Sequence, residues 1–264
     1  AHVLNVSSLA RTGPIVTKRP SLLKVYIQGC FNSWTDACYT RLMDISKYEK
    51  ERTQVAAFMT RLYDRQLTTA SGGNISLRIN DDLFCITPSA LDKGMLTFED
   101  IAVVTMEGKN LTSRLPLSIE TEMHRLSLIA RPDCRAIVHA HPTYTSAFTA
   151  ITKDGKCAID TTMIAESFYI LEKPVMVQYR LMGTVNLAEQ VAIKAFDHSV
   201  LLLENHGAVT LGKSLLEAFD KMELLERAAQ MTTIATQMAS QGYDVSTLDD
   251  ARCDQLMRMK YGNT

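Results

Sequence analysis

The sequence lacks the features that mark membrane-spanning, nucleic-acid-binding and nucleotide-binding proteins. No apolar run approaches the roughly 18 residues that would suggest a membrane span, so no membrane contact is expected. The formal net charge is −1, which excludes a broad basic surface for nucleic acid but leaves room for a small anion site. Neither G-x-G-x-x-G nor the P-loop pattern occurs, so the nucleotide-phosphate motifs are absent.

The chain also lacks a disulfide framework of cysteines, and its N-terminal segment lacks acidic residues. Its six cysteines are scattered and form no C-x-x-C pair, which favours reduced thiols in a cytoplasmic protein. The first 35 residues contain Arg and Lys but no Asp or Glu. We interpret residues 1–45 as an N-terminal extension of unknown role, either transit-like or a surface arm, and residues 46–264 as one folded domain.

Hydrophobic periodicity predicts helices and strands that alternate along the folded domain. Helices are predicted at about residues 46–66, 119–130, 143–151, 186–196, 214–240 and 247–260. Strands are predicted at about residues 74–79, 83–87, 102–106, 134–141, 174–179, 199–207 and 208–212. Helix N-caps are expected at Ser46, Ser118, Asn186 and Ser214. Because some strands are hairpin-linked and others alternate with helices, we expect an α/β domain with a mixed sheet covered on both faces.

Three histidines are candidates for metal ligands. His139 and His141 alternate along one predicted strand, so their side chains point to the same face. Two imidazoles buried without partners would be costly, and a divalent metal removes that cost, but H-x-H alone leaves core histidines equally open. His206 ends another predicted strand before Gly207, and a third imidazole with an open fourth position is typical of catalytic zinc. His198 lies in a polar turn and is a poor candidate.

Candidate carboxylates and anion-binding turns are weaker signals. Glu120 is predicted in the first turn of its helix, where the helix dipole favours a carboxylate in any case. It becomes a candidate ligand or general base only if the three histidines lie nearby. The turn at Gly72, Gly73 and Asn74 and the helix start at Ser118 could offer donors to an anion, although such turns are usually only turns.

The motifs SGGNIS, ITPSAL, LPLSIETEMH, RPDCRAIVHAH and LLLENHGAV, in this order, resemble the class II aldolase/adducin head family from about residue 46 onwards. The resemblance implies a three-layer α/β/α fold with a central mixed, largely antiparallel sheet. It also implies a homotetramer with active sites between subunits. The similarity is greatest to the L-fuculose-1-phosphate aldolase branch. That branch implies a zinc-dependent carbon–carbon lyase of carbohydrate metabolism, which reversibly cleaves a ketose 1-phosphate to dihydroxyacetone phosphate and an aldehyde.

The resemblance assigns roles to individual residues. His139, His141 and His206 match the zinc-binding histidines, with one Zn²⁺ implied per subunit. Glu120 matches the carboxylate that binds zinc in the resting site and then moves the proton. Tyr261 falls where the aldolases have a mobile C-terminal tyrosine near the active site. The phosphate-binding positions fall on Gly73, Asn74, Ser89, Ala90, Ser118 and Ile119.

Several positions depart from the family pattern and leave the substrate open. Ile119 replaces a frequent second serine, and Ala90 replaces a glycine. Thr162 lies near the position of the tyrosine that protonates the aldehyde oxygen, and Tyr169, seven residues on, could substitute for it. Sugar-phosphate 4-epimerases, dehydratases and decarboxylases of the same fold are alternatives, as is a non-enzymatic adducin-type module. Glu120, where the epimerases typically have Asp, favours an aldolase, and the retained histidines argue against the non-enzymatic module.

Overall fold

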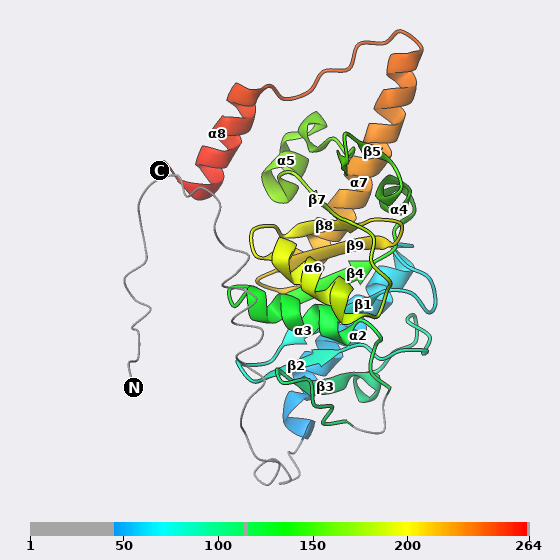
Figure 1. Ribbon diagram of the computed structural model, residues 1–264, viewed down its shortest axis with the longest axis vertical. Helices are drawn as coiled ribbons and strands as arrows, with labels where there is room; N and C mark the ends of the chain where they lie inside the picture. Colours follow the sequence, from blue (N-terminus) through cyan, green and yellow to red (C-terminus); the bar gives the residue numbers. More distant parts are fainter. Residues whose placement is uncertain (1–44, 113–115, 263–264) are drawn as a thin grey trace. The chain divides into compact units, whose positions relative to one another are not determined.

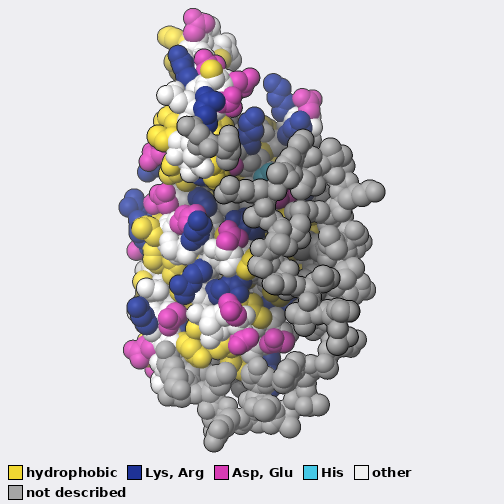
Figure 2. Space-filling view, turned by 90° about the vertical axis from the view of Figure 1, so that its left-hand side faces the viewer, with side chains coloured by type: hydrophobic (Ala, Val, Ile, Leu, Met, Phe, Trp, Pro, Cys, Tyr) yellow, Lys and Arg dark blue, Asp and Glu magenta, His cyan; other side chains and the backbone are white. Residues whose placement is uncertain are grey.

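The computed structural model describes residues 45–112 and 116–262. The predicted N-terminal extension, apart from Ile45, therefore lies outside the described residues. Among the residues that are described, no helix is both long and apolar enough to cross a membrane. Figure 2 shows Lys and Arg intermingled with Asp and Glu over the described part of one face, as the near-zero net charge leads one to expect.

A seven-stranded sheet runs through the described domain in the order β3-β2-β1-β4-β9-β8-β7 (Figure 1). The strands are β1 (Asn74–Arg78), β2 (Leu83–Ile86), β3 (Ala102–Thr105), β4 (Ala136–Ala140), β7 (Val175–Val177), β8 (Val200–Leu203) and β9 (Gly207–Gly212). Neighbouring strands are antiparallel except for the parallel pair β7 and β8. The prediction of a mixed, largely antiparallel sheet is confirmed.

Helices cover both faces of this sheet and give the domain its three layers (Figure 1). They are α2 (Glu49–Asp64), α3 (Thr121–Ala130), α4 (Thr143–Thr149), α5 (Ala165–Leu171), α6 (Val185–Ala195), α7 (Leu215–Ser240) and α8 (Asp250–Tyr261). One apolar core joins α2 and α7 to the sheet face that carries Val138. A second core joins α3 and α6 to the face that carries Ile137. Because strand residues alternate between faces, His139 lies on the same face as Ile137, toward α3.

Strand β4 lies at the centre of the sheet, and its register decides what surrounds the histidines. His139 is paired with Asn74 at the start of β1 on one side and with Val209 of β9 on the other. Because both neighbours are antiparallel, β1 and β9 begin where β4 ends. The end of β4, the loop before β1 and the turn before β9 therefore meet at one edge of the sheet.

Of the four predicted N-caps, Ser214 is confirmed, whereas Ser46, Asn186 and Ser118 are not the N-caps of their helices. Helix α2 begins at Glu49 after a 3₁₀ turn (Ile45–Tyr48), with Tyr48 rather than Ser46 at the N-cap. Helix α6 is capped by Thr184, whose side chain accepts from the Leu187 amide at 3.3 Å, and not by Asn186. The errors at Ser46 and Asn186 arise because several cap-forming residues stand close together and the apolar pattern does not select among them. Ser214 caps α7 as predicted, accepting from the amide of Glu217 at 3.1 Å.

The short hairpin and one helix between α4 and β7 were not predicted. The hairpin pairs β5 (Thr152–Lys153) with β6 (Lys156–Cys157), and α5 follows it. Strands of two residues carry too little alternation to be detected by periodicity.

Glu226 of α7 fixes the segment that directly follows β4. Its carboxylate accepts hydrogen bonds from the Tyr144 amide at 2.9 Å and from the amide and hydroxyl of Thr145, both at 2.8 Å. The carboxylate thus satisfies free N–H groups at the N-terminus of α4, where negative charge is also favoured by the helix dipole. Since α4 begins two residues after His141, this contact anchors the backbone beside that histidine.

We expect Glu226→Gln to lower the free energy of unfolding by about 1–3 kcal/mol, because the amide replaces a buried charged acceptor of three hydrogen bonds. Denaturant titration measures the change. Glu223→Gln on the same helix is the matched control. Its ion pairs with Arg61 and Arg65 are partly exposed, at 3.7 and 3.6 Å, and should contribute less than about 1 kcal/mol. Equal losses in the two variants would contradict the anchoring role of Glu226.

Candidate metal centre

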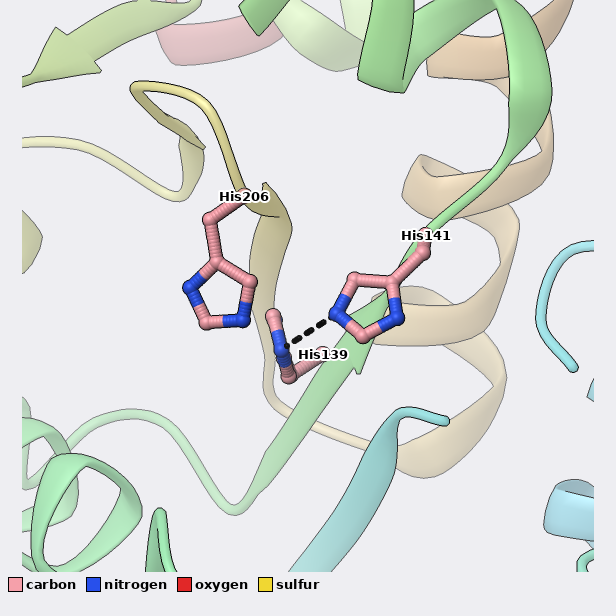
Figure 3. A group of neighbouring side chains, drawn as sticks. All are labelled: His139, His141 and His206. Carbon is pink, nitrogen blue, oxygen red and sulfur yellow. Dashed lines mark hydrogen bonds between the residues drawn. The ribbon is translucent and has the colours of Figure 1, made fainter. Parts of the chain in front are cut away.

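Three imidazoles converge at the edge of the sheet where β4 ends (Figure 3). His139 lies on β4, His141 follows its last residue, and His206 belongs to the turn between β8 and β9. The Nε2 atoms of His139 and His141 are 3.1 Å apart, and one ligand nitrogen from each of the three rings lies within 4.8 Å of the others. Nitrogens that share one tetrahedral zinc ion lie about 3.3 Å apart, so the predicted grouping of the three histidines is confirmed as a candidate divalent-metal site.

Two glycines allow the chain to pass this close to the rings. A Cβ on Gly207 would lie 2.4 Å from Cδ2 of His141 and 2.6 Å from the Ala140 oxygen. Gly73 has a φ of +67°, and its Cβ would lie 2.8 Å from the His139 oxygen. Side chains at either position would push the backbone away from the histidines, so these two glycines belong to the architecture of the site.

The hydrogen bond of His139 fixes which of its nitrogens faces the site. Its Nδ1 lies 2.9 Å from the backbone oxygen of Ala208, and because a carbonyl only accepts, Nδ1 must carry the hydrogen. In the neutral ring, Nε2 then presents a lone pair to the space between the three histidines. Orientation of a metal-ligating imidazole by a backbone carbonyl is a common arrangement around bound metals.

Glu120 joins the three histidines, although not from the helical position predicted for it. Its Oε2 lies 3.1 Å from Nε2 of His139, and its Oε1 lies 3.3 Å from Nε2 of His206. Helix α3 begins at Thr121, so Glu120 is the N-cap and not a first-turn residue, and its side chain does not cap the helix. The predicted cap, Ser118, instead accepts from the Glu120 amide at 3.3 Å. The Glu120 carboxylate does not cap the helix because it is turned away from the helix end and toward the imidazoles.

A chain of buried hydrogen bonds holds that carboxylate in place. The Asn74 amide nitrogen donates to Glu120 Oε2 at 2.9 Å and lies 3.1 Å from the Ser118 hydroxyl. Its oxygen is therefore free to accept from Nε2 of His124 at 2.5 Å. The other ring nitrogen of His124 then accepts from the Ser76 hydroxyl at 2.7 Å. Each of these hydrogen bonds pairs a donor with an acceptor, so the network fixes the orientation of both Asn74 and Glu120.

The charges of the buried groups match the needs of a divalent cation. Burial opposes ionisation of Glu120, but His139 and the Asn74 amide hold the pKa of the carboxyl below its usual range. Burial, together with the neighbouring His139 and His206, lowers the pKa of His141 to about 3. Burial also lowers the pKa of His206, whereas Glu120 raises the pKa of His139. Divalent metals take neutral imidazole nitrogens and an ionised carboxylate as donors, so a bound cation would take the place of a proton on His139.

One oxygen of Glu120 supplies a direct test of whether a cation fits this site. Its Oε1 is buried and has no hydrogen-bond partner among the described residues. A buried carboxylate oxygen without a partner is costly, and a cation between Glu120 and the histidines would remove that cost. The residues present therefore fit a divalent metal.

A cavity of about 180 Å³ opens above the histidines. Most of the predicted phosphate-binding residues line it, namely Gly73, Asn74, Ser89, Ser118 and Ile119. Glu120, His141 and His206 line it too. Ala90 is the exception: it does not line the cavity, and it adopts a φ of +58°, the left-handed conformation that glycine takes most easily.

The tyrosines and the threonine considered from sequence lie elsewhere within the chain. The Tyr261 hydroxyl donates to Glu172, and burial together with this carboxylate raises the pKa of Tyr261 to about 12. Tyr261 and Tyr169 line a second cavity, and Thr162 donates to Asp160 at 2.6 Å beside a third. None of them lines the histidine cavity in the described part of one chain.

Sequence reasoning missed three other residues of the site. Lys93 lines the cavity although only 1% of it is exposed, and Met182 lines the cavity too. Ser76 ends the hydrogen-bond chain behind Glu120. Lys93 stands in "LDKGML", which reads as an ordinary surface turn, and no periodic pattern marks any of the three.

A buried three-histidine site with an adjacent carboxylate, at the edge of a sheet covered by helices on both faces, defines a metal-binding α/β domain. A family model, Class II Aldolase and Adducin N-terminal domain, matches residues 53–233, which is more than half of the chain. The chain therefore belongs to the class II aldolase and adducin N-terminal domain family.

Relatives in this family carry more than one activity in their names. An L-fuculose phosphate aldolase of Methanococcus maripaludis is 38% identical over 173 residues, covering 66% of this chain and 91% of the relative. A 3-oxo-tetronate 4-phosphate decarboxylase of Haemophilus influenzae is 33% identical over 172 residues, covering 64% of this chain and 80% of the relative.

Solved structures show the same fold. A structure of L-fuculose 1-phosphate aldolase matches with a TM-score of 0.70 and 26% identity, covering 84% of this chain and all of that one. YgbL of Escherichia coli, described as an aldolase/epimerase/decarboxylase, matches with a TM-score of 0.72 and 25% identity, covering 80% and 99% of the two chains.

We expect the protein to take up one divalent cation per chain and His206→Ala to weaken that binding more than about 100-fold. Removing a residue that only hydrogen-bonds to a metal ligand typically lowers metal affinity 10–100-fold, and His206→Ala removes a candidate ligand itself. Competition with a chromophoric chelator measures the affinity. His198→Ala, at an exposed histidine, is the control and should bind as the unchanged protein does. Equal affinities for the two variants would remove His206 from the site.

Ala90→Gly should raise the free energy of unfolding by up to about 1 kcal/mol. The left-handed conformation costs an alanine about 1–2 kcal/mol, and this exceeds the entropic cost of glycine, about 0.4–1 kcal/mol. Denaturant titration measures the change. Ala235→Gly, within the right-handed helix α7, should instead lose about 1 kcal/mol. A loss at both positions would show that Ala90 is not strained.

Proposed function

We propose that the protein is a zinc-dependent aldolase that reversibly cleaves a ketose 1-phosphate, such as L-fuculose 1-phosphate, to dihydroxyacetone phosphate and an aldehyde. The observation that carries the proposal is the meeting of three imidazoles with the Glu120 carboxylate beside one cavity that the Gly73 and Ser89 loops line. A metal site combined with anion-binding loops suits a phosphorylated substrate with a carbonyl group.

His139, His141 and His206 would hold the cation, with Glu120 as the fourth donor in the resting site. When bound, zinc supplies a Lewis acid that polarises a ketone oxygen. Burial lowers the pKa of His141 and of His206, whereas for His139 the neighbouring Glu120 outweighs burial and raises the pKa. The Ala208 carbonyl orients Nε2 of His139 toward the site. The protein's own contribution is thus a rigid set of donors and a shielded carboxylate.

Glu120 is the group we assign to the proton at C3 of the substrate. In cleavage, the C3–C4 bond breaks, its electron pair moves to C3, and Glu120 delivers a proton to that carbon. In the aldol direction Glu120 removes the same proton. The C4 hydroxyl becomes the aldehyde and gives up its proton, so the reaction is balanced without an oxidant. The hydrogen bond from Asn74 and the chain through His124 keep the carboxylate aimed at this position.

The C4 hydroxyl needs a proton acceptor, and no tyrosine in the described part of the chain lines the histidine cavity. Within its own chain Tyr261 contacts Glu172 in a separate cavity. We therefore propose that Tyr261 acts only by reaching the histidine cavity of a neighbouring subunit in a homotetramer. Gly73, Asn74, Ser89, Ser118 and Ile119 form the proposed phosphate site, with Ala90 shaping its loop.

A decarboxylase is the second candidate, and the absence of a tyrosine among the residues described as lining the cavity favours it. Loss of CO₂ from a 3-oxo-tetronate 4-phosphate leaves the same three-carbon phosphate, with the same proton to be added by Glu120. Carbon dioxide departs without giving up a hydroxyl proton, so this reaction needs no additional base. The Haemophilus influenzae relative carries this activity in its name.

A substrate panel with zinc present separates the candidates. L-fuculose 1-phosphate heads the ketose phosphates, and a 3-oxo-tetronate 4-phosphate represents the acids. An aldehyde together with dihydroxyacetone phosphate supports the aldolase, whereas CO₂ together with dihydroxyacetone phosphate supports the decarboxylase. If no substrate yields either pair of products, epimerases and dehydratases become the leading candidates. If the chain takes up no metal, an adducin-type module is favoured.

Glu120→Gln should keep most of the metal binding and reduce turnover at least about 100-fold, because the amide cannot carry the proton. Turnover is followed through dihydroxyacetone phosphate, and the metal content is measured on the same sample. Glu122→Gln is the matched control, since that carboxylate pairs with Arg125 and not with the histidines. Full turnover in Glu120→Gln would reject the role assigned to Glu120.

A further inference from the structure

Lys93 is buried between the two loops that line the histidine cavity. Its backbone amide donates to the Ala70 oxygen at 2.8 Å, next to the glycine turn. Its ammonium group donates to the Pro88 oxygen, next to Ser89. The residue is 1% exposed and is one of those that line the cavity. A positive charge is therefore enclosed at the point where both proposed anion-binding loops meet.

Lys93 has no carboxylate to balance it among the described residues. No ion pair involves it within the described part of the chain, and the Pro88 oxygen occupies one of its three N–H donors. The other buried lysine described differs in this respect. Lys221 donates to Glu217 and to the Leu211 oxygen, both at 2.8 Å. Lys221 thus has a structural partner, and Lys93 retains unused charge and donors.

Burial of an ammonium group without a counter-charge is unfavourable, and for Lys93 burial lowers its pKa to about 8. The group nevertheless remains mostly charged at neutral pH. An anion bound in the cavity would supply the missing counter-charge and accept the unused hydrogen bonds. The buried ammonium group of Lys93 is therefore unfavourable in the free protein and would be stabilised when an anion binds in the cavity.

We propose that Lys93 is the cationic contact for the phosphate group of the substrate. This inference rests on the proposed function only in placing a phosphorylated substrate in the cavity. A phosphate dianion suits the site because it combines high charge with several acceptor oxygens. The hydroxyls of Ser89 and Ser118 line the same cavity, whereas Ile119 brings no side-chain donor to it. Lys93 thus supplies charge where the neighbouring loop supplies an apolar side chain.

Dihydroxyacetone phosphate is the probe that tests the inference, because it is a product of both candidate reactions. Isothermal titration calorimetry on the zinc-loaded full chain compares it with dihydroxyacetone, which lacks the phosphate. Inorganic phosphate is titrated into the metal-free chain as a second arm. Lys93→Met preserves the length of the side chain and removes its charge. Lys109→Met, at an exposed lysine, is the control.

We expect Lys93→Met to weaken dihydroxyacetone phosphate about 10- to 100-fold and to leave dihydroxyacetone unchanged. Phosphate binding to the metal-free chain should fall in parallel, and Lys109→Met should alter neither. Unchanged affinity for dihydroxyacetone phosphate in Lys93→Met would overturn the inference. Equal weakening of both ligands would also overturn it, because that pattern belongs to a residue that only supports the loops.

If Lys93→Met is less stable than the unchanged protein, thermal unfolding with and without ligand provides a second test. A phosphate contact predicts that dihydroxyacetone phosphate raises the melting temperature of the unchanged protein more than that of Lys93→Met. If Lys93 only supports the structure, Lys93→Met should melt at a lower temperature without ligand, and dihydroxyacetone phosphate should raise the melting temperatures of both proteins equally. The outcome is independent of turnover. A protein that cleaves no ketose phosphate but loses phosphate affinity in Lys93→Met would reject the aldolase and keep the inference.

Discussion

The contact of one buried carboxylate with buried imidazoles is the interaction on which the rest of the site depends. Burial opposes ionisation of Glu120, and His139 and Asn74 favour its charged form. Its second oxygen still has no hydrogen-bond partner among the described residues. The arrangement is therefore incomplete as a purely structural cluster, and a divalent cation would complete it. The hydrogen bonds through Asn74 and His124 serve to hold the carboxylate in this position.

The sheet explains how residues distant in sequence reach one point. Because β4 is central and both of its neighbours are antiparallel, its end meets the start of β1 and the turn before β9. That geometry brings Asn74, His139 and His206 together, and the N-terminus of α3 adds Glu120 from the same face. Glycines at 73 and 207 permit the close approach. The fold thus fixes the donors, whereas the surrounding loops leave the choice of substrate to individual side chains.

Sequence reasoning identified the sheet, most helices and the candidate metal donors, because alternation, helical spacing and the H-x-H pattern are local signals. It placed Glu120 in the first helical turn and not at the N-cap, because cap-forming residues cluster there and the pull of the imidazoles is not visible in sequence. It missed Lys93 for a similar reason. The burial of that lysine depends on the meeting of two loops, and its own neighbours in sequence resemble a surface turn. The role of Tyr261 stays a prediction.

The central claim is that His139, His141 and His206 hold one divalent cation beside Glu120. X-ray diffraction from zinc-loaded crystals, with data collected at the absorption edge of zinc, tests it most directly. The account predicts one anomalous peak per chain, about 2.0–2.1 Å from a nitrogen of each of the three imidazoles. A zinc peak bound elsewhere, with the three rings unchanged and unliganded, would contradict it.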